Sequence, residues 1–264
     1  MIETNIQPKV YKPVGHCIYC GTNKGELSKE HIVPFGLAGN WMILPKASCR
    51  SCAEITRDIE QFCLRWMLGP LRIRLNLPTR RKKARPSQLS LEYIRADGQK
   101  ELVTVPTQEY PFVCTGFRFS APGLLRGVQP NESAKGELVE VVIRYIEGEI
   151  RNHIKSDGQR VKLSTVNMQQ FSRMLAKIAH AYAIAEYGEN SFVPMLPDLI
   201  LGKSDTSAYL VGGDVSAPLL DEPVLHHIYR QDCLSNGVEY MLIAIRLFAF
   251  VGMPRYHVVV GKKL

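Results

Sequence analysis

Cys17-Ile-Tyr-Cys20 and Cys49-Arg-Ser-Cys52 bracket the tripeptide Glu30-His31-Ile32, and this stretch decides how the first part of the chain folds. Two such CxxC pairs can converge on one tetrahedral zinc ion, because each pair supplies two thiolates from a tight turn while the chain between them folds back. Four thiolates leave no open position for water or substrate. The spacing therefore predicts a structural Zn²⁺ held by Cys17, Cys20, Cys49 and Cys52, rather than four unrelated buried thiols.

The composition is that of a folded, soluble protein with a basic surface. The chain has 264 residues, and 45% of them are hydrophobic, which is enough for one large or two modest domains. Its net charge of +8 favours polyanionic partners such as nucleic acid. The number of cysteines is odd, which disfavours a secreted disulfide framework. The N-terminus lacks the apolar core of a signal peptide, and the apolar run 240–251 is too short to cross a bilayer. We therefore expect a cytoplasmic protein without a membrane partner.

The first 68 residues predict a small zinc module. We expect a short strand near 27–33, a glycine-bearing loop at 36–40 and a helix over 53–67, whose apolar residues recur at spacings of three and four. Gly69-Pro70 ends that helix. Residues 69–87 form a basic linker, because basic side chains follow one another there without an acidic residue.

Residues 88–264 predict a larger α+β domain. Segments 89–94, 101–105 and 138–143 are rich in β-branched residues and partly alternate, as strands do. One strong amphipathic helix with a stripe from Phe171 to Ala185 ends at Gly188. Segments 239–251 and 256–260 are expected to be buried strands, joined at 252–254. The fold class is therefore α+β, with a zinc module followed by a larger domain.

The tripeptide between the cysteine pairs carries groups suited to phosphodiester hydrolysis. This reaction needs a base to activate water, a divalent metal to stabilise charge, and a means of holding the strand. His31 has an unperturbed pKa near neutral pH and suits the base, while the Glu30 carboxylate suits a hard cation such as Mg²⁺. Adjacent side chains in a strand diverge, so the two residues can fill both roles.

At this point the chain resembles the HNH endonuclease family in its zinc-stabilised form. The resemblance rests on CxxC, then Glu-His-Ile-x-Pro, then a glycine-containing loop, then CxxC opening a helix, and it covers about residues 17–60. It implies a ββα-metal fold and a metal-dependent DNA endonuclease that leaves a 5′-phosphate. By position, His31 matches the general base, Glu30 the ligand of a catalytic Mg²⁺ or Mn²⁺, and Asn40 the central asparagine of the family.

One position departs from that family. Its helix usually begins with an Asn or His that binds the catalytic metal, and here that position is Ala53. Glu60 lies on the same helical side as Ala53 and could replace the missing ligand, or Glu54 could turn inward. The metal is therefore held differently, or the site is weakened.

The basic run after the predicted helix is a solvated linker or a phosphate-binding segment. Its members are Arg80, Arg81, Lys82, Lys83 and Arg85. Directly after a nuclease helix, we expect them to contact the phosphates of double-stranded DNA without reading its sequence. His180, His226 and His227 lack partners at metal spacing, and His180 is expected to be a hydrogen-bonded core or rim residue.

Two functions remain open at this point. The first is an HNH-type endonuclease that hydrolyses DNA with one divalent metal and His31 as base. The second is a zinc module that binds nucleic acid or a protein partner without cleavage, with Ala53 marking a lost site. The larger domain could recognise DNA, form a homodimer so that both strands are cut, or sense a ligand as in bacterial defence proteins.

Overall fold

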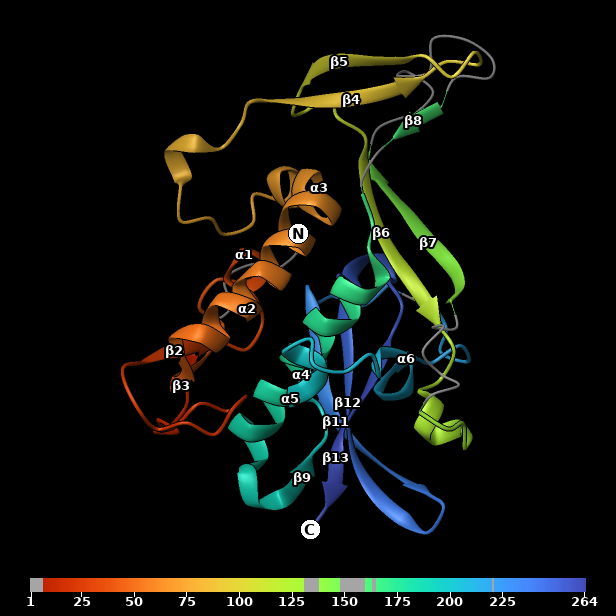
Figure 1. The fold of residues 1–264 in the computed structure, drawn as a ribbon. Coiled ribbons are helices and arrows are strands. Elements are labelled where there is room, and N and C mark those ends of the chain that lie inside the picture. Colours follow the sequence, from red (N-terminus) through yellow and green to blue (C-terminus); the bar gives the residue numbers. More distant parts are fainter. Residues whose placement is uncertain (1–6, 131–137, 148–159, 163–164, 220) are drawn as a thin grey trace.

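The computed structural model describes residues 7–130, 138–147, 160–162, 165–219 and 221–264, and Figure 1 shows its elements. The N-terminal part contains strands β1 (Lys9–Val10), β2 (Leu27–His31) and β3 (Met42–Cys49), helices α1 (Phe35–Ala38), α2 (Arg50–Phe62) and α3 (Gly69–Arg74), and a π-helical turn at Cys63–Met67. The middle contains β4 (Gln88–Ile94), β5 (Lys100–Pro106), β6 (Phe112–Phe119), β7 (Leu138–Glu147) and β8 (Arg160–Lys162). The C-terminal part contains α4 (Met168–Tyr187), β9 (Phe192–Pro194), α5 (Pro197–Ile200), α6 (Ser207–Leu210), β10 (Val211–Gly213), β11 (His226–Ser235), β12 (Val238–Leu247) and β13 (Tyr256–Lys263). The mixture confirms the expected α+β class.

The region around the cysteines has two antiparallel strands followed directly by a helix. β2 pairs with β3 in antiparallel register, β1 adds to the other edge of β3 in parallel, and α2 begins immediately after β3. The order of elements here is β2, α1, β3, α2. α2 starts at Arg50, three residues before the predicted start, and the predicted end at 63–67 is π-helical. The expected glycine-bearing loop contains the short helix α1.

Helix α4 is the central element of the molecule. It begins where the side chain of Asn167 accepts a hydrogen bond from the backbone N–H of Gln170, and it ends at Gly188, whose φ of 79° is in the left-handed region. The predicted apolar stripe is buried from Phe171 to Ile178 and partly buried at Tyr182 and Ala185, and most residues on the other faces of the helix are buried too. Figure 1 shows α4 between α2 on one side and β12 and β13 on the other, which it contacts. A helix buried nearly all round is expected in such a position.

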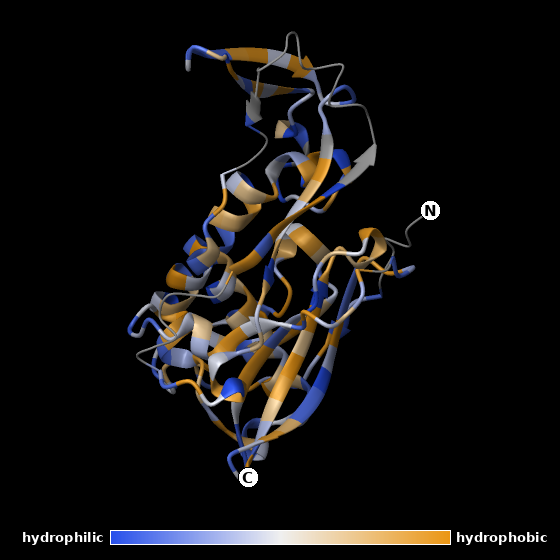
Figure 2. Cartoon of the chain, turned by 90° about the vertical axis from the view of Figure 1, so that its right-hand side faces the viewer, coloured by the Kyte–Doolittle hydropathy of each residue, from blue (hydrophilic) through white to orange (hydrophobic). Residues whose placement is uncertain are grey.

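The C-terminal sheet has the strand order β10-β13-β12-β11, and β9 also pairs with β13. Hydrophobic residues run along its strands (Figure 2). Strand β11, which was not expected from the sequence, forms a hairpin with β12. The turn is Asn236-Gly237, and both residues have positive φ, which is the conformation of a tight two-residue hairpin loop.

One continuous core joins the two ends of the chain. Its buried apolar residues extend from Cys17 to Val260, and within the expected linker Leu71 of α3 and Leu77 are part of it. The hairpin β4–β5 has a small core of its own and lies apart from α4 in Figure 1. The domain boundaries expected from the sequence stay predictions. Among the described residues, no helix has both the length and the apolar content needed to cross a membrane.

Candidate functional site

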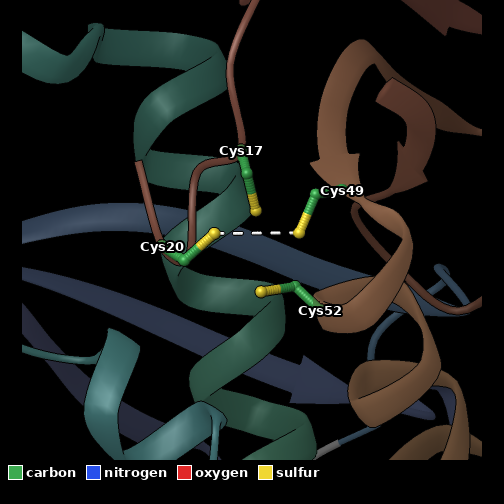
Figure 3. A group of neighbouring side chains, drawn as sticks. All are labelled: Cys17, Cys20, Cys49 and Cys52. Carbon is green, nitrogen blue, oxygen red and sulfur yellow. Dashed lines mark hydrogen bonds between the residues drawn. The ribbon is translucent and has the colours of Figure 1, made fainter. Parts of the chain in front are cut away.

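The four cysteines of the two CxxC pairs come together in space. Cys17 and Cys20 lie on a turn before β2, while Cys49 ends β3 and Cys52 lies in the first turn of α2. Their sulfur atoms all lie within 4.8 Å of one another, and they point toward a common centre in Figure 3. The Sγ atoms of Cys20 and Cys49 are 3.7 Å apart. Tetrahedral Zn–S bonds of about 2.3 Å place sulfur atoms about 3.8 Å apart, so the cluster fits a structural zinc ion.

The electrostatics of the cluster also fit a bound cation. Burial raises the pKa of the Cys17 and Cys52 thiols, so thiolates at these positions need a positive charge beside them. A divalent metal supplies that charge. In the part of the chain that the structure describes, this is the one group of three or more His, Cys, Asp or Glu residues whose ligand atoms lie close enough for a metal ion.

A groove with a volume of about 1090 Å³ runs along β2 and α2 beside this cluster. It is lined by five basic side chains, namely Lys24, Lys29, Arg50, Arg57 and Arg80, and by four acidic ones, namely Glu26, Glu30, Glu54 and Glu60. His31 also lines it, so the structure brings the predicted base, the predicted acid Glu30 and the two alternative acids Glu54 and Glu60 to one surface. Ala53 lines the same groove as Glu60, as the helical spacing predicts, and Thr56 and Arg57 of α2 line it too.

His31 is half-buried in the wall of the groove and is held by Asn40. The imidazole Nε2–H donates to Asn40 Oδ1 at 3.1 Å, and the ring packs edge-on against Phe35. In a neutral imidazole this arrangement leaves the lone pair on Nδ1. Burial lowers the pKa of His31, and the charges of Lys177, Lys29 and Arg80 lower it further, while the bond to Asn40 opposes them. His31 is therefore a neutral proton acceptor at pH 7.

Glu30 and Glu60 are held by a third residue, Lys177 of α4. Its Nζ lies 2.6 Å from Glu30 Oε1 and 2.7 Å from Glu60 Oε1, and it also donates to the backbone carbonyl of His31. Burial alone would lower the pKa of Lys177, but the charges of the two carboxylates outweigh burial and raise it. The ammonium is fully buried, which a charge tolerates only when it is paired and hydrogen-bonded.

This arrangement differs from the expected catalytic metal site. The sequence predicts Glu30 as a ligand of Mg²⁺ or Mn²⁺ and leaves Glu60 or Glu54 to replace the missing helix ligand. In the structure, the ammonium of Lys177 lies between the Oε1 atoms of Glu30 and Glu60. The carboxylates as arranged do not fit a divalent ion, because the ammonium takes an oxygen of each and would repel the metal. Glu54, the other acid weighed for this role, is exposed and forms an ion pair with Arg50 at 3.3 Å.

The basic segment lies beside the groove. Arg80, Arg81 and Lys83 are exposed, and the guanidinium of Arg80 lies 5.5 Å from the centre of the Phe35 ring. Arg85 is instead partly buried and donates to the backbone carbonyls of Ile73 and Leu77 at 3.3 and 2.6 Å, so it holds the segment in place. The side chain of Lys82 lies outside the described part of the structure.

The remaining histidines of the core have structural partners. His180 is buried and its Nε2–H donates to the Ile18 carbonyl at 2.7 Å, as expected of a core residue. His226 is also buried, and its Nδ1 accepts the backbone N–H of Phe248 at 3.2 Å. Burial lowers the pKa of each to about 4.

Lys177 is the site residue that sequence reasoning missed. A signal for it exists: it follows Met174 by three residues and Phe171 by six, so it lies among the apolar residues of α4. A lysine in such a position needs a buried acidic partner. The sequence does not show which acid that is, because Glu30 lies 147 positions away.

Comparisons of the chain with models of protein families, with curated proteins and with solved structures found no match.

Proposed function

We propose that the groove binds nucleic acid and that the protein hydrolyses phosphodiester bonds with His31 as the general base. The observation that carries this proposal is a neutral histidine, oriented by Asn40, in the wall of a groove lined by five basic side chains. Nδ1 of His31 would accept a proton from a water molecule as the water oxygen attacks phosphorus and the P–O bond to the leaving oxygen breaks.

The basic side chains have two roles in this proposal. Lys29, Arg57 and Arg80 line the groove with His31, so they would contact the phosphates and stabilise the charge that develops during attack. Arg81 and Lys83 extend the positive surface beyond Arg80 and would hold the neighbouring phosphates. Double-stranded DNA remains the proposed substrate, as the resemblance to HNH endonucleases implies. The resemblance also implies dependence on Mg²⁺ or Mn²⁺, but Glu30 and Glu60, paired with Lys177, do not offer a site for such an ion.

A second function is favoured by one observation. Lys177 neutralises Glu30, and the helix position expected to bind a metal is Ala53. Both features would suit a module that binds nucleic acid without cutting it. In that case His31 and the basic side chains of the groove would still contact phosphates.

The experiment that separates these functions is a cleavage assay with zinc-loaded protein and plasmid DNA, with added Mg²⁺, with added Mn²⁺ and with neither. His31→Ala should lower the cleavage rate by about 10²- to 10⁴-fold, because a positioned base contributes that much. Binding, followed by fluorescence anisotropy of labelled duplex DNA, should remain near the wild-type affinity.

His227→Ala is the matched control, because His227 is an exposed histidine of β11 that does not line the groove. Its cleavage rate should equal that of the wild type. Binding without cleavage under all three conditions would support the second function. Absence of both binding and cleavage, on DNA and on RNA, would contradict the proposal.

A further inference from the structure

Lys177 has the contacts of a bound cation. Its ammonium has three N–H groups, and three acceptors meet them: Glu30 Oε1, Glu60 Oε1 and the carbonyl of His31. The carbonyl of Ile32 lies 3.4 Å away as a fourth oxygen. The side chain is 1% exposed, so water does not share these contacts. Oxygen atoms of two carboxylates and a carbonyl are the kind of ligand that a hard divalent cation takes.

The position of the ammonium relative to the groove distinguishes it from an ordinary buried ion pair. Both acidic partners line the groove, and the Glu60 side chain is 19% exposed there. A cation arriving from solvent would therefore reach Glu60 first. The Glu60 carboxylate is already paired with the Lys177 ammonium. The ammonium and the arriving cation would repel each other strongly, because water is excluded around Lys177.

We propose that Lys177 is the resident cation of this site: its ammonium takes the place of a divalent metal between Glu30 and Glu60, and its replacement by a neutral side chain creates a divalent-cation site. The wild-type protein would bind no Mg²⁺ or Mn²⁺ there. One consequence rests on the proposed function: phosphodiester cleavage with His31 as the base should proceed without an added divalent metal.

The packing of α4 against α2 supplies a charge to the region of the two cysteine pairs. Lys177 lies 146 residues beyond His31 and yet contacts its carbonyl, so the larger part of the chain supplies the charge that the two acids of the ββα region require. A metal would supply that charge without α4. The resident cation therefore couples the geometry of the groove to the packing of α4 against α2.

The test measures Mn²⁺ binding to the zinc-loaded full chain in the absence of nucleic acid. Electron paramagnetic resonance and calorimetry detect the bound ion. Wild-type protein and Lys177→Arg should bind no Mn²⁺ at the groove, because both keep the cation. Lys177→Met should bind one Mn²⁺ per chain. Adding Glu60→Gln to Lys177→Met removes a charged ligand, so it should weaken that binding by at least the roughly 10- to 100-fold that loss of an outer-shell partner costs.

Two results would overturn the inference. The first is tight binding of one Mn²⁺ by the wild type that Glu60→Gln weakens. The second is a folded Lys177→Met variant that binds no Mn²⁺. If Lys177→Met does not fold, as judged by circular dichroism, the wild-type and Glu60→Gln measurements decide the matter on their own. Because no substrate is present, these outcomes are independent of whether the protein cuts nucleic acid.

Discussion

Three histidines, His31, His180 and His226, differ in burial and in hydrogen-bond partner, and these differences set which of them can accept a proton at the surface. His180 and His226 are buried with backbone partners, whereas His31 is half-exposed and donates to a side chain at the surface. Only His31 therefore combines a proton-accepting nitrogen with access to a groove. The identity of the residue predicts none of this, because a histidine pKa is set by burial and by nearby charge.

The bond between His31 and Asn40 can be tested without substrate. Burial lowers the pKa of His31, and the hydrogen bond to Asn40 opposes that effect, so Asn40→Ala should lower the pKa further. NMR titration of the His31 ring protons in wild type and variant measures both values. A wild-type pKa at or above the ordinary value of about 6.5 would contradict the environment described here.

At the scale of elements, the two CxxC pairs tie a turn to the first turn of α2. Cys49→Ala removes one of four zinc ligands, so we expect loss of zinc and a fall in the free energy of unfolding on the order of several kcal/mol. Zinc content by elemental analysis and urea unfolding check this. Cys233→Ala is the control, since Cys233 lies outside the cluster, and it should keep one zinc per chain.

The segment after α3 contains two kinds of basic residue. Arg85 holds backbone carbonyls, while Arg80, Arg81 and Lys83 are exposed. Replacing these three by glutamine should weaken binding to every DNA sequence alike. The slope of log affinity against log salt concentration should fall by about 0.9 for each phosphate that the variant no longer neutralises.

The control for this segment is a variant with the same loss of charge elsewhere, at the exposed residues Lys12, Lys203 and Lys262. Its salt slope should stay near that of the wild type. Equal effects of the two triple variants would mean that overall charge, and not this segment, attracts DNA. Arg85→Gln belongs in neither set, because it should destabilise the fold itself.

On the scale of the whole molecule, buried neutral histidines predict how stability depends on pH. The folded-state pKa values of His180 and His226 are about 4, below the unfolded value of about 6.5. The unfolded chain therefore binds more protons between these two pH values. Stability should be full above pH 6.5 and fall as the pH drops toward 4, by up to about 1.4 kcal/mol per pH unit for each histidine.

Urea unfolding at a series of pH values measures this dependence. His226→Gln should reduce the slope of the free energy of unfolding against pH between pH 4 and 6.5 by the contribution of one histidine, up to about 1.4 kcal/mol per pH unit. Ile228→Val, in the same strand, should instead lower stability by about 0.5–1.5 kcal/mol at every pH and leave the slope unchanged. A slope that His226→Gln leaves intact would show that other groups take up the protons.

Features that depend on spacing along the chain can be predicted from the residues alone. The doubled CxxC spacing was enough to predict the cysteine cluster, because each pair lies within one turn. Helix α4 followed from its apolar spacing and from Gly188. The hairpin of β11 and β12 also has a local signal, because Asn236-Gly237 is typical of two-residue hairpin loops.

Which distant side chains meet depends on how the elements pack in three dimensions. It placed Asn40 on His31 through the short helix α1, turned Arg85 inward, and brought Lys177 between Glu30 and Glu60. No local pattern encodes such contacts, because they arise when α4 packs on α2 and buries charges that must then find partners. Whether Glu30 can bind a metal, as the resemblance implies, therefore depends on Lys177, which lies far outside residues 17–60 that carry the resemblance.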